Sequence, residues 1–513
     1  MNRLSAAALA AALLAAPARP QNPSAVLAIR ASQTGPRVHR QIFGQFAEHL
    51  GYGIYGGIWV GEDSKIPNTR GYRNDVLQAL RNLKVPVVRW PGGCFADEYN
   101  WREGIGPRHK RPVKINTHWG GVTEPNSFGT HEFMEFAELI GAEAYVSGNV
   151  GSGSPREMAE WVEYMTSPAG SLAAERAANG RQDPWKLPYF GLGNELWGCG
   201  GSMRAEYAAD VTRRYSTFVK VPAGVTIRKM ASGPSDANYH WTEVMMRDAG
   251  RYIDGIGLHY YTLPGTWARK GPAYGFDETA WAKTLAATLK IDDYIARHSA
   301  IMDKYDPAKR VWLGVDEWGS WYDPEPGTNR GFLQQQNTLR DAVIAALNFN
   351  IFVRRAERVK MANIAQMVNV LQAMIFTKDG KMVLTPTYHA FDLYKVYQDT
   401  DSLPFVLDSP LYQKDEWSMP AVSASAVRGP DGVIHTGLVN TDPIRAVALT
   451  IRVDGASVSR VSGRILTASA MDARNTFESP SNVVPASFDA ARVEAGAVRL
   501  SLPPKSVLML DLR

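Results

Sequence analysis

The chain has 513 residues, of which 45% are hydrophobic and 21% are charged, and its formal net charge is +5. This length exceeds one typical domain, and the composition is that of an ordinary globular protein. The small positive charge is spread out without a long Lys/Arg block, which argues against a nucleic-acid partner.

The N-terminus has the pattern of a secretory signal peptide. Residues 1–3 give a positively charged start, an Ala/Leu-rich run extends from Leu4 to Leu14, and small residues follow at 15–18. The apolar run is shorter than the ~20 residues that cross a bilayer, and no later run reaches that length, so we expect no membrane span. We therefore predict that residues 1–22 are removed and that the protein is exported, to a periplasm or outside the cell.

Eight short apolar segments alternate with helical patterns from residue 41 to about 369. Each segment is too short for a surface helix, which favours buried parallel strands. Helix signals lie between them, such as the capping box of Ser154 to Glu157. Eight is the strand number of a (β/α)8 TIM barrel. We place its strands at residues 42–49, 85–90, 142–149, 187–195, 229–233, 255–261, 311–317 and 359–369.

The pattern changes after about residue 400. Hydrophobic residues alternate with period two from Val447 to Val453 and again from Leu508 to Leu512. Such alternation, with turn sequences between the strands, predicts an all-β sandwich of jelly-roll type. We therefore assign residues 41–385 to a catalytic barrel and residues 386–513 to a C-terminal β-sandwich.

Two glutamates close predicted barrel strands within short, distinctive motifs. Glu195 ends the motif Gly-Asn-Glu, and Glu317 lies in Asp-Glu-Trp. Hydrolysis of a glycosidic bond needs two carboxyl groups, one to protonate the leaving oxygen and one to attack the sugar or activate water. A single glutamate at a strand end is often a structural ion-pair partner, but two at the C-terminal ends of barrel strands favour a glycosidase site.

Cysteine usage and motif spacing argue against metals and cofactors. Cys94 and Cys199 are the two cysteines, too few for a four-cysteine zinc site, and they either pair across a 105-residue separation or stay free. Residues 131–135 lack the second histidine of a zincin, and residues 148–153 have the wrong glycine order for dinucleotide binding. A Gly-x-Ser-x-Gly elbow is also missing, which weakens an esterase interpretation. We expect no cofactor.

Longer motifs resemble one family, the α-L-arabinofuranosidases of glycoside hydrolase family 51, within the retaining (β/α)8-barrel clan. They fall at predicted strand ends or in adjacent loops, and the resemblance extends from about residue 25 to the C-terminus. The segments that carry it are residues 46–51, 88–95, 99–107, 191–195, 257–262, 316–318 and 361–369. Family resemblance also implies that residues 23–40 supply strands to the β-sandwich.

The resemblance assigns roles to individual side chains. It implies that Glu195 is the general acid/base and Glu317 the nucleophile of a retaining, two-step hydrolysis. Asn194 is expected to bind the hydroxyl next to the anomeric carbon. Further sugar contacts are implied for Glu48, Cys94, Tyr261 and Gln366, although each would be interpreted as structural on its own.

Other side chains complete the predicted site. Arg89 and Tyr261 are expected to orient the nucleophile and keep it ionised, because a positive charge or a donor favours the carboxylate. His259 is expected to support the end of its strand rather than bind a metal. Trp101 and Trp321 are candidates to pack on the furanose ring or the next sugar, with a position in the core as the alternative.

The predicted function is exo-acting removal of terminal α-L-arabinofuranosyl residues from arabinoxylan, arabinan or arabino-oligosaccharides. One alternative keeps the same machinery for β-xylosides or β-glucans. Another, from a different class, is a carbohydrate-binding protein that has lost activity, which the two intact glutamates argue against. The resemblance also implies a homo-oligomer, often a hexamer.

Overall fold

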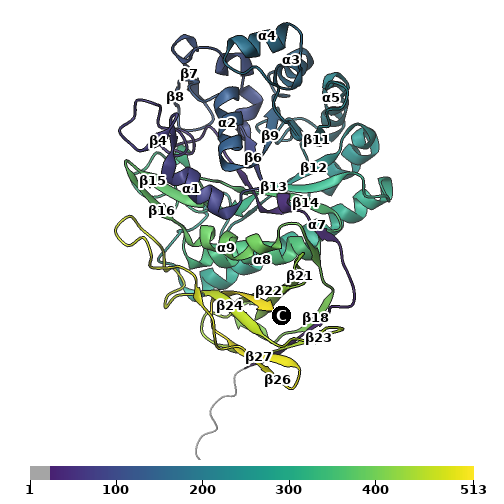
Figure 1. The fold of residues 1–513 in the computed structure, drawn as a ribbon, viewed down its shortest axis with the longest axis vertical. Coiled ribbons are helices and arrows are strands. Elements are labelled where there is room, and N and C mark those ends of the chain that lie inside the picture. The colour runs from purple at the N-terminus through teal and green to yellow at the C-terminus, as the bar shows by residue number, and fades with distance from the viewer. Residues whose placement is uncertain (1–22) are drawn as a thin grey trace, which may run out of the picture.

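A computed structural model describes residues 23–513 of the chain, and the predicted signal peptide lies outside these residues. A helix-covered barrel forms one half of the molecule and a β-sandwich the other (Figure 1). None of the helices in the described part of the chain is long and apolar enough to cross a membrane.

Eight parallel strands close into a barrel, in the order β10-β11-β12-β13-β14-β3-β6-β9. All eight residues of β12 are buried, which explains why polar and apolar residues do not alternate along this segment. The observation confirms the predicted (β/α)8 fold. The strands are β3 (Gly44–Phe46), β6 (Val87–Trp90), β9 (Glu143–Gly148), β10 (Tyr189–Leu192), β11 (Arg228–Ala231), β12 (Gly255–Thr262), β13 (Trp312–Ser320) and β14 (Val359–Ala365).

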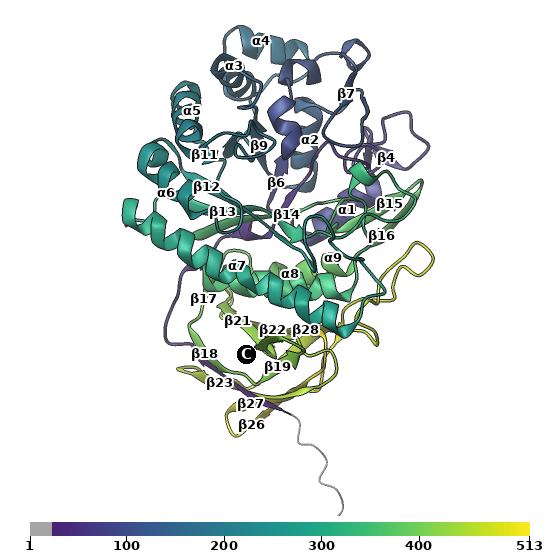
Figure 2. The ribbon, with the colours of Figure 1, turned by 180° about the vertical axis from the view of Figure 1, so that it is seen from behind.

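Helices surround the barrel, and one of them joins it to the sandwich. Helix α8 is buried at every residue from its start to Val353, because it lies between the barrel and the sandwich (Figures 1 and 2). A capping box between Thr338 and Asp341 starts this helix. The α-helices are α1 (Asn74–Leu83), α2 (Thr130–Ile140), α3 (Pro155–Thr166), α4 (Ser171–Ala178), α5 (Ala205–Phe218), α6 (Tyr239–Val244), α7 (Glu278–Tyr305), α8 (Leu339–Arg354) and α9 (Pro386–Tyr394).

The sandwich consists of two sheets. Strand β1 (Ser24–Arg30) pairs antiparallel with β18 (Phe405–Asp408) and parallel with β23 (Val447–Asp454), so the start of the described chain lies in a sheet built from its end. The same sheet holds β27 (Ala497–Leu502) and β26 (Arg492–Glu494). The other sheet contains β2 (Arg37–Val38), β17 (Thr400–Ser402), β21 (Val422–Arg428), β22 (Ile434–Asn440), β28 (Ser506–Leu512), β24 (Val461–Leu466) and β25 (Ala486–Ser487).

Short hairpins extend the loops that follow the barrel strands. Hairpins β4–β5 (Asn68–Thr69, Tyr72–Arg73) and β7–β8 (Lys114–Asn116, Val122–Glu124) follow β3 and β6, and β15–β16 (Ile375–Lys378, Lys381–Leu384) follows β14. All three lie on the same side of the barrel in both views (Figures 1 and 2). This is the side of the C-terminal strand ends, where barrel enzymes carry their sites. A fourth hairpin, β19–β20 (Leu411–Lys414, Trp417–Pro420), belongs to the sandwich half.

Candidate active site

Glu195 and Glu317 meet at this end of the barrel, with His259 between them. His259 Nδ1 lies 2.8 Å from Glu195 Oε1 and 3.5 Å from Glu317 Oε2. One carboxylate oxygen of each glutamate and one His259 nitrogen all lie within 4.8 Å of one another. Carboxyl groups of retaining glycosidases are about 5–5.5 Å apart, whereas inverting enzymes separate them by about 6.5–9.5 Å. The separation here suits direct attack by one carboxylate.

A tight turn presents Glu195. The predicted strand ends at Leu192, three residues earlier than expected, and Gly193 and Glu195 then adopt left-handed φ values of 79° and 42°. A Cβ atom on Gly193 would lie 2.8 Å from Leu196, so glycine is required both for its conformation and for its packing. A glutamate with positive φ is uncommon, and its surroundings must hold it in place.

Asp97 holds this turn and was not among the predicted site residues. Its carboxylate accepts hydrogen bonds from the backbone N–H groups of Val150 and Gly151 at 2.8 Å and of Asn194 at 2.7 Å. Burial raises the pKa of Asp97 to about 7, although the three N–H donors oppose this rise. The adjacent Cys94 belongs to the same one-turn helix, Cys94–Glu98, and is bonded to Cys199 in a disulfide. Two connections therefore fix the loop that carries the predicted acid/base.

Each oxygen of the Glu317 carboxylate accepts one strong hydrogen bond. Tyr261 donates its hydroxyl proton to Oε1 at 2.7 Å, and Arg89 Nη1 donates to Oε2 at 2.9 Å. Arg89 Nη2 also donates to Asn194 Oδ1 at 2.5 Å. Arg89 lies over the Phe46 ring, 4.6 Å from its centroid, so the guanidinium is packed as well as bonded. These contacts hold the Glu317 carboxylate in one orientation and place a positive charge beside it.

Glu48 occupies a buried pocket of donors. Its Oε1 accepts hydrogen bonds from the backbone N–H of Gly93 at 3.0 Å and from Trp119 Nε1 at 2.9 Å, and its Oε2 accepts one from Gln366 Nε2 at 3.0 Å. Burial, followed by the charge of Glu317, raises the pKa of Glu48 to about 7. Trp119 was not among the predicted site residues.

His259 is surrounded by carboxylates. Its Nε2 lies 3.5 Å from Asp316 Oδ1, and its Nδ1 faces both catalytic candidates. Burial alone would lower the pKa of His259, but the charge of Glu317 and the bonds to Asp316 and Glu195 raise it to about 10. Burial also raises the pKa of Glu195, and the charge of Glu317 adds to this rise. The geometry lets a protonated Glu195 accept from His259 through Oε1 while Oε2 carries the acidic proton.

Each of the two candidate metal clusters has one feature that opposes metal binding. Within the described residues, ligand atoms come within 4.8 Å in two groups, Glu195 with His259 and Glu317, and Glu195 with both cysteines. The raised pKa of His259 keeps this imidazole protonated near neutral pH, and a metal requires it neutral. The cysteines are joined as a disulfide and offer no thiolate.

The two predicted tryptophans lie in different surroundings. Trp321 packs edge-on against Tyr261, with ring centroids 4.9 Å apart, and is half-buried at the edge of the site. Trp101 is 3% exposed, stacks on Trp161 and donates its N–H to the carbonyl of Glu157. The structure therefore brings Trp321 to the site and places Trp101 in the core, the alternative considered for it.

The comparisons with known proteins agree on one family. Residues 316–506 match the model described as "Alpha-L-arabinofuranosidase C-terminal domain", and residues 79–278 match "Alpha-L-arabinofuranosidase 1 domain". The chain is 51% identical over 492 residues to an "intracellular exo-alpha-L-arabinofuranosidase" of Bacteroides ovatus, with 96% of each chain covered.

Solved structures of arabinofuranosidases are also similar to this chain. The GH51 arabinofuranosidase from Xanthomonas axonopodis pv. citri is 59% identical, with a TM-score of 0.95 over 96% of this chain and 100% of that one. The α-L-arabinofuranosidase from Thermotoga maritima, in a complex with arabinose, is 30% identical, with a TM-score of 0.84 over 95% of this chain and 99% of that one.

The relative from Bacteroides ovatus corrects the prediction of export. That protein is described as intracellular and aligns with nearly the whole of this chain, so export to a periplasm or outside the cell is not supported. The prediction depended only on the composition of residues 1–18, where a basic start and a short Ala/Leu run form a pattern of low specificity.

Proposed function

This chain belongs to the α-L-arabinofuranosidases of glycoside hydrolase family 51, and we propose that it removes terminal α-L-arabinofuranosyl residues from arabinoxylan, arabinan or arabino-oligosaccharides with retention of configuration. The observation that carries the proposal is the approach of the Glu195 and Glu317 carboxylates to within 4.8 Å, across His259. That spacing leaves no room for a water molecule positioned for direct inversion.

In the first step, Glu195 gives its proton to the glycosidic oxygen while Glu317 attacks the anomeric carbon. The bond to the leaving group breaks, and an ester forms between the sugar and Glu317. The raised pKa of Glu195 keeps the proton available, as the role requires. In the second step, the Glu195 carboxylate takes a proton from water, the water oxygen attacks the same carbon, and the ester bond breaks.

The surrounding side chains position the reactants. Arg89 and Tyr261 each hold one oxygen of Glu317, which fixes the carboxylate for attack. Arg89 also holds Asn194 Oδ1, which leaves the Asn194 amide N–H groups to donate to the sugar hydroxyl beside the reacting carbon. Glu48 binds hydroxyls on the far side of the ring.

Hydrolysis of p-nitrophenyl α-L-arabinofuranoside tests the proposal. We expect activity in the intact protein and a fall of about three orders of magnitude or more in Glu195→Ala and in Glu317→Ala. The exposed Glu416→Ala is the matched control and should keep full activity. With azide, the Glu195 variant should yield the α-azide after two inversions, and the Glu317 variant the β-azide after one. Intact activity in either variant, or exchanged azide products, would overturn the assignment.

We also propose a homo-oligomer, with a hexamer as the form that family membership favours. Light scattering coupled to gel filtration tests this directly. The mass of a single chain at all concentrations would contradict it.

A further inference from the structure

Two consecutive carboxyl groups of strand β13 both face the catalytic site. Successive side chains of a regular strand point to opposite faces, so an undistorted strand would turn Asp316 away from the site that Glu317 enters. The strand is bulged at this point. Gly257 of β12 pairs with Gly314 of β13, but His259, two residues further along β12, pairs with Glu317, three residues further along β13. The pairing of β13 with β14 contains the same extra residue. Bulges redirect side chains beside active sites, and this one brings Asp316 to the catalytic residues.

The carboxylate of Asp316 has a place built for it. Asp316 is 3% exposed, and its Oδ2 accepts a hydrogen bond from the Tyr145 hydroxyl at 2.7 Å and lies 3.9 Å from Arg89 Nε. Gly257 leaves the necessary space, because a Cβ atom there would lie 2.4 Å from Asp316 Oδ1. Burial would raise the pKa of Asp316, but His259 and Arg89 hold it below its usual value. The group is therefore a buried, ionised carboxylate.

Asp316 and Glu195 approach opposite nitrogens of the His259 ring. Asp316 Oδ1 has no hydrogen-bond partner within the described residues, and it lies 3.5 Å from His259 Nε2. His259 Nδ1 lies 2.8 Å from Glu195 Oε1. A carboxylate beside one nitrogen favours the imidazolium, in which both nitrogens carry a proton. Nδ1 therefore presents an N–H group to Glu195.

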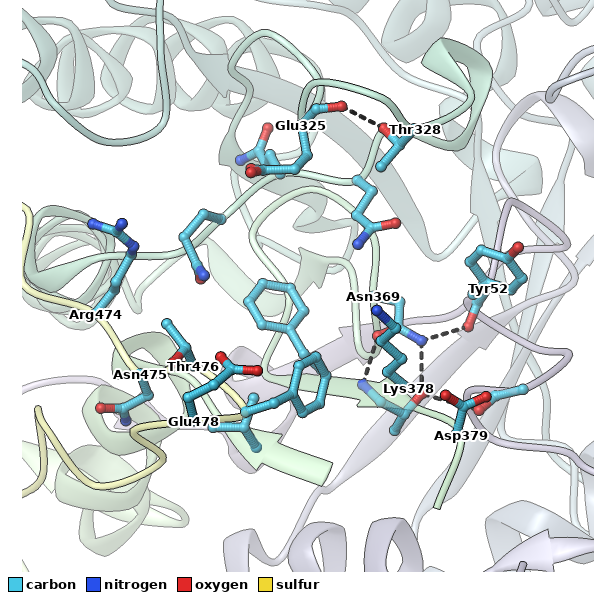
Figure 3. Close-up of a pocket in the computed structure, with 18 of the residues that line it drawn as sticks. Tyr52, Glu325, Thr328, Asn369, Lys378, Asp379, Arg474, Asn475, Thr476 and Glu478 are labelled. Atoms are coloured by element: carbon cyan, nitrogen blue, oxygen red, sulfur yellow. Dashed lines mark hydrogen bonds between the residues drawn. The ribbon is translucent and has the colours of Figure 1, made fainter. Parts of the chain in front are cut away.

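A second ligand site does not account for this buried charge. The cavity in Figure 3, of about 740 Å³, is lined by loops that follow β3, β13 and β14 and by residues 474–478 of the sandwich. Neither Tyr145, His259 nor Asp316 is among the described residues that line it. The contacts of Asp316 are those of the catalytic site.

We propose that Asp316 is a positioning residue for the first chemical step, which holds the His259 imidazolium against Glu195 and so stabilises the carboxylate that Glu195 becomes. The proposal rests on the proposed function. The proton passes from Glu195 Oε2 to the glycosidic oxygen, which keeps the electron pair of the broken bond, and no proton leaves His259 or Asp316. A p-nitrophenolate leaving group needs little protonation, whereas a sugar alkoxide needs a full proton. Asp316 therefore matters most when the leaving group is a sugar.

A comparison of two leaving groups tests this role. The value of kcat/KM reports formation of the arabinosyl ester, the step that uses Glu195 as an acid. We expect Asp316→Asn, which removes the charge and keeps the size, to lower kcat/KM on α-1,5-arabinobiose about 10- to 100-fold. On p-nitrophenyl α-L-arabinofuranoside the value should stay within about threefold. Asp210→Asn makes the same change at an exposed aspartate of α5 and should alter neither substrate.

A double-mutant cycle shows whether Asp316 acts through His259. His259→Asn should give the same difference between the two substrates, and Asp316→Asn combined with His259→Asn should be no more than about twofold below His259→Asn alone. Tyr145→Phe removes the hydrogen bond that orients Asp316, and it should reproduce the difference at about 2- to 5-fold, which provides a test if Asp316→Asn does not fold. Additive losses, or equal losses on both substrates, would overturn the proposal.

NMR titration of the imidazole nitrogens measures the effect of Asp316 without turnover. Although burial lowers it, the pKa of His259 is raised to about 10 by Glu317, Asp316 and Glu195. The other charged groups near the ring, Asp236 after β11 and Arg89, stay in place in the variant. The chain has 10 histidines, so the spectrum of His259→Asn identifies the signal.

We expect the His259 titration midpoint to fall by at least about one pH unit in Asp316→Asn. An unchanged midpoint in the folded variant would show that Asp316 does not control His259 and would overturn the proposal. Inactivity of the intact protein on the aryl arabinoside would instead refute the proposed function, and a lowered midpoint would still establish that Asp316 controls the charge of His259.

Discussion

Replacing Glu48 by glutamine isolates the charge of a buried carboxylate. Its Oε1 accepts the backbone N–H groups of Gly93 and Phe95 and the Trp119 indole, contacts that a glutamine oxygen can keep. Its Oε2 accepts from Gln366 Nε2, whereas Gln366 Oε1 is buried without a partner. Rotation of the Gln366 amide would offer that oxygen to the new NH2 group. The change therefore removes charge with little loss of bonding.

The expected effect depends on pH. Burial and the charge of Glu317 raise the pKa of Glu48 from 4.5 to about 7, which corresponds to about 3 kcal/mol. Between pH 4.5 and pH 7, Glu48 keeps its proton in the folded protein but has lost it in the unfolded chain. The free energy of unfolding therefore falls as the pH rises through this range. The Glu48→Gln variant does not show this fall in stability, because glutamine does not titrate. We expect the variant to gain about 3 kcal/mol in free energy of unfolding, relative to the intact protein, between pH 4.5 and pH 8.

Urea unfolding at a series of pH values measures this difference. The exposed Glu416→Gln serves as the control and should follow the intact protein throughout. A stability difference between Glu48→Gln and the intact protein that stays constant from pH 4.5 to 8 would refute the reasoning. Above pH 7, where Glu48 is ionised, the variant should also lose about 10- to 100-fold in kcat/KM on the aryl arabinoside, because a charged acceptor for sugar hydroxyls becomes neutral.

Three further changes have defined outcomes. Asp97→Asn turns an NH2 group toward backbone N–H donors, so the free energy of unfolding in urea should fall by about 1–3 kcal/mol, and kcat should fall as well. An unchanged midpoint of urea unfolding would contradict this prediction. Reduction of the Cys94–Cys199 disulfide, which closes a separation of 105 residues, should lower the free energy of unfolding by up to about 4–5 kcal/mol. Thermal unfolding with and without TCEP measures this change. Identical unfolding curves, in a sample where thiol titration shows that both cysteines are reduced, would disprove it. Tyr261→Phe removes one donor to Glu317 and should lower kcat/KM about tenfold or more while leaving the fold intact, and a full rate would show that the bond is dispensable.

The sequence predicted the architecture because the barrel and the sandwich depend on patterns that are local in the chain. Strand β12 is buried throughout and shows no polar/apolar alternation, whereas β23 alternates, and each pattern reports how many faces of the strand are buried. Glu195 and Glu317 were predictable because each ends a short apolar run. The ends of the strands were harder to predict. The strand before Glu195 ends three residues earlier than expected, because a left-handed turn does not change the hydrophobic periodicity of the sequence.

The supporting residues were harder to predict because their partners are distant in sequence. Asp97 bonds to Asn194 across 97 positions, and Trp119 bonds to Glu48 across 71. Neither pair forms a motif, and only the packing of the loops that follow β3, β6 and β10 in the folded barrel brings them together. Asp316 lies inside the Asp-Glu-Trp motif, but its contacts could not be predicted from that motif. In the structure it accepts a hydrogen bond at 2.7 Å from the hydroxyl of Tyr145, which lies on another strand. Non-local contacts of this kind are set by tertiary structure.

The charge balance of the site explains why it holds protons at neutral pH. Two buried cations, Arg89 and His259, face a larger number of carboxyl groups. These are the buried Glu48, Asp97, Asp316 and Glu317 and the partly buried Glu195. Complete ionisation would leave uncompensated negative charge in a medium that solvates it poorly, so some of these groups must stay protonated. Burial raises the pKa of Glu48, Asp97 and Glu195 accordingly. The same imbalance that reduces stability as the pH rises therefore keeps a proton on the residue that must donate it to the leaving oxygen.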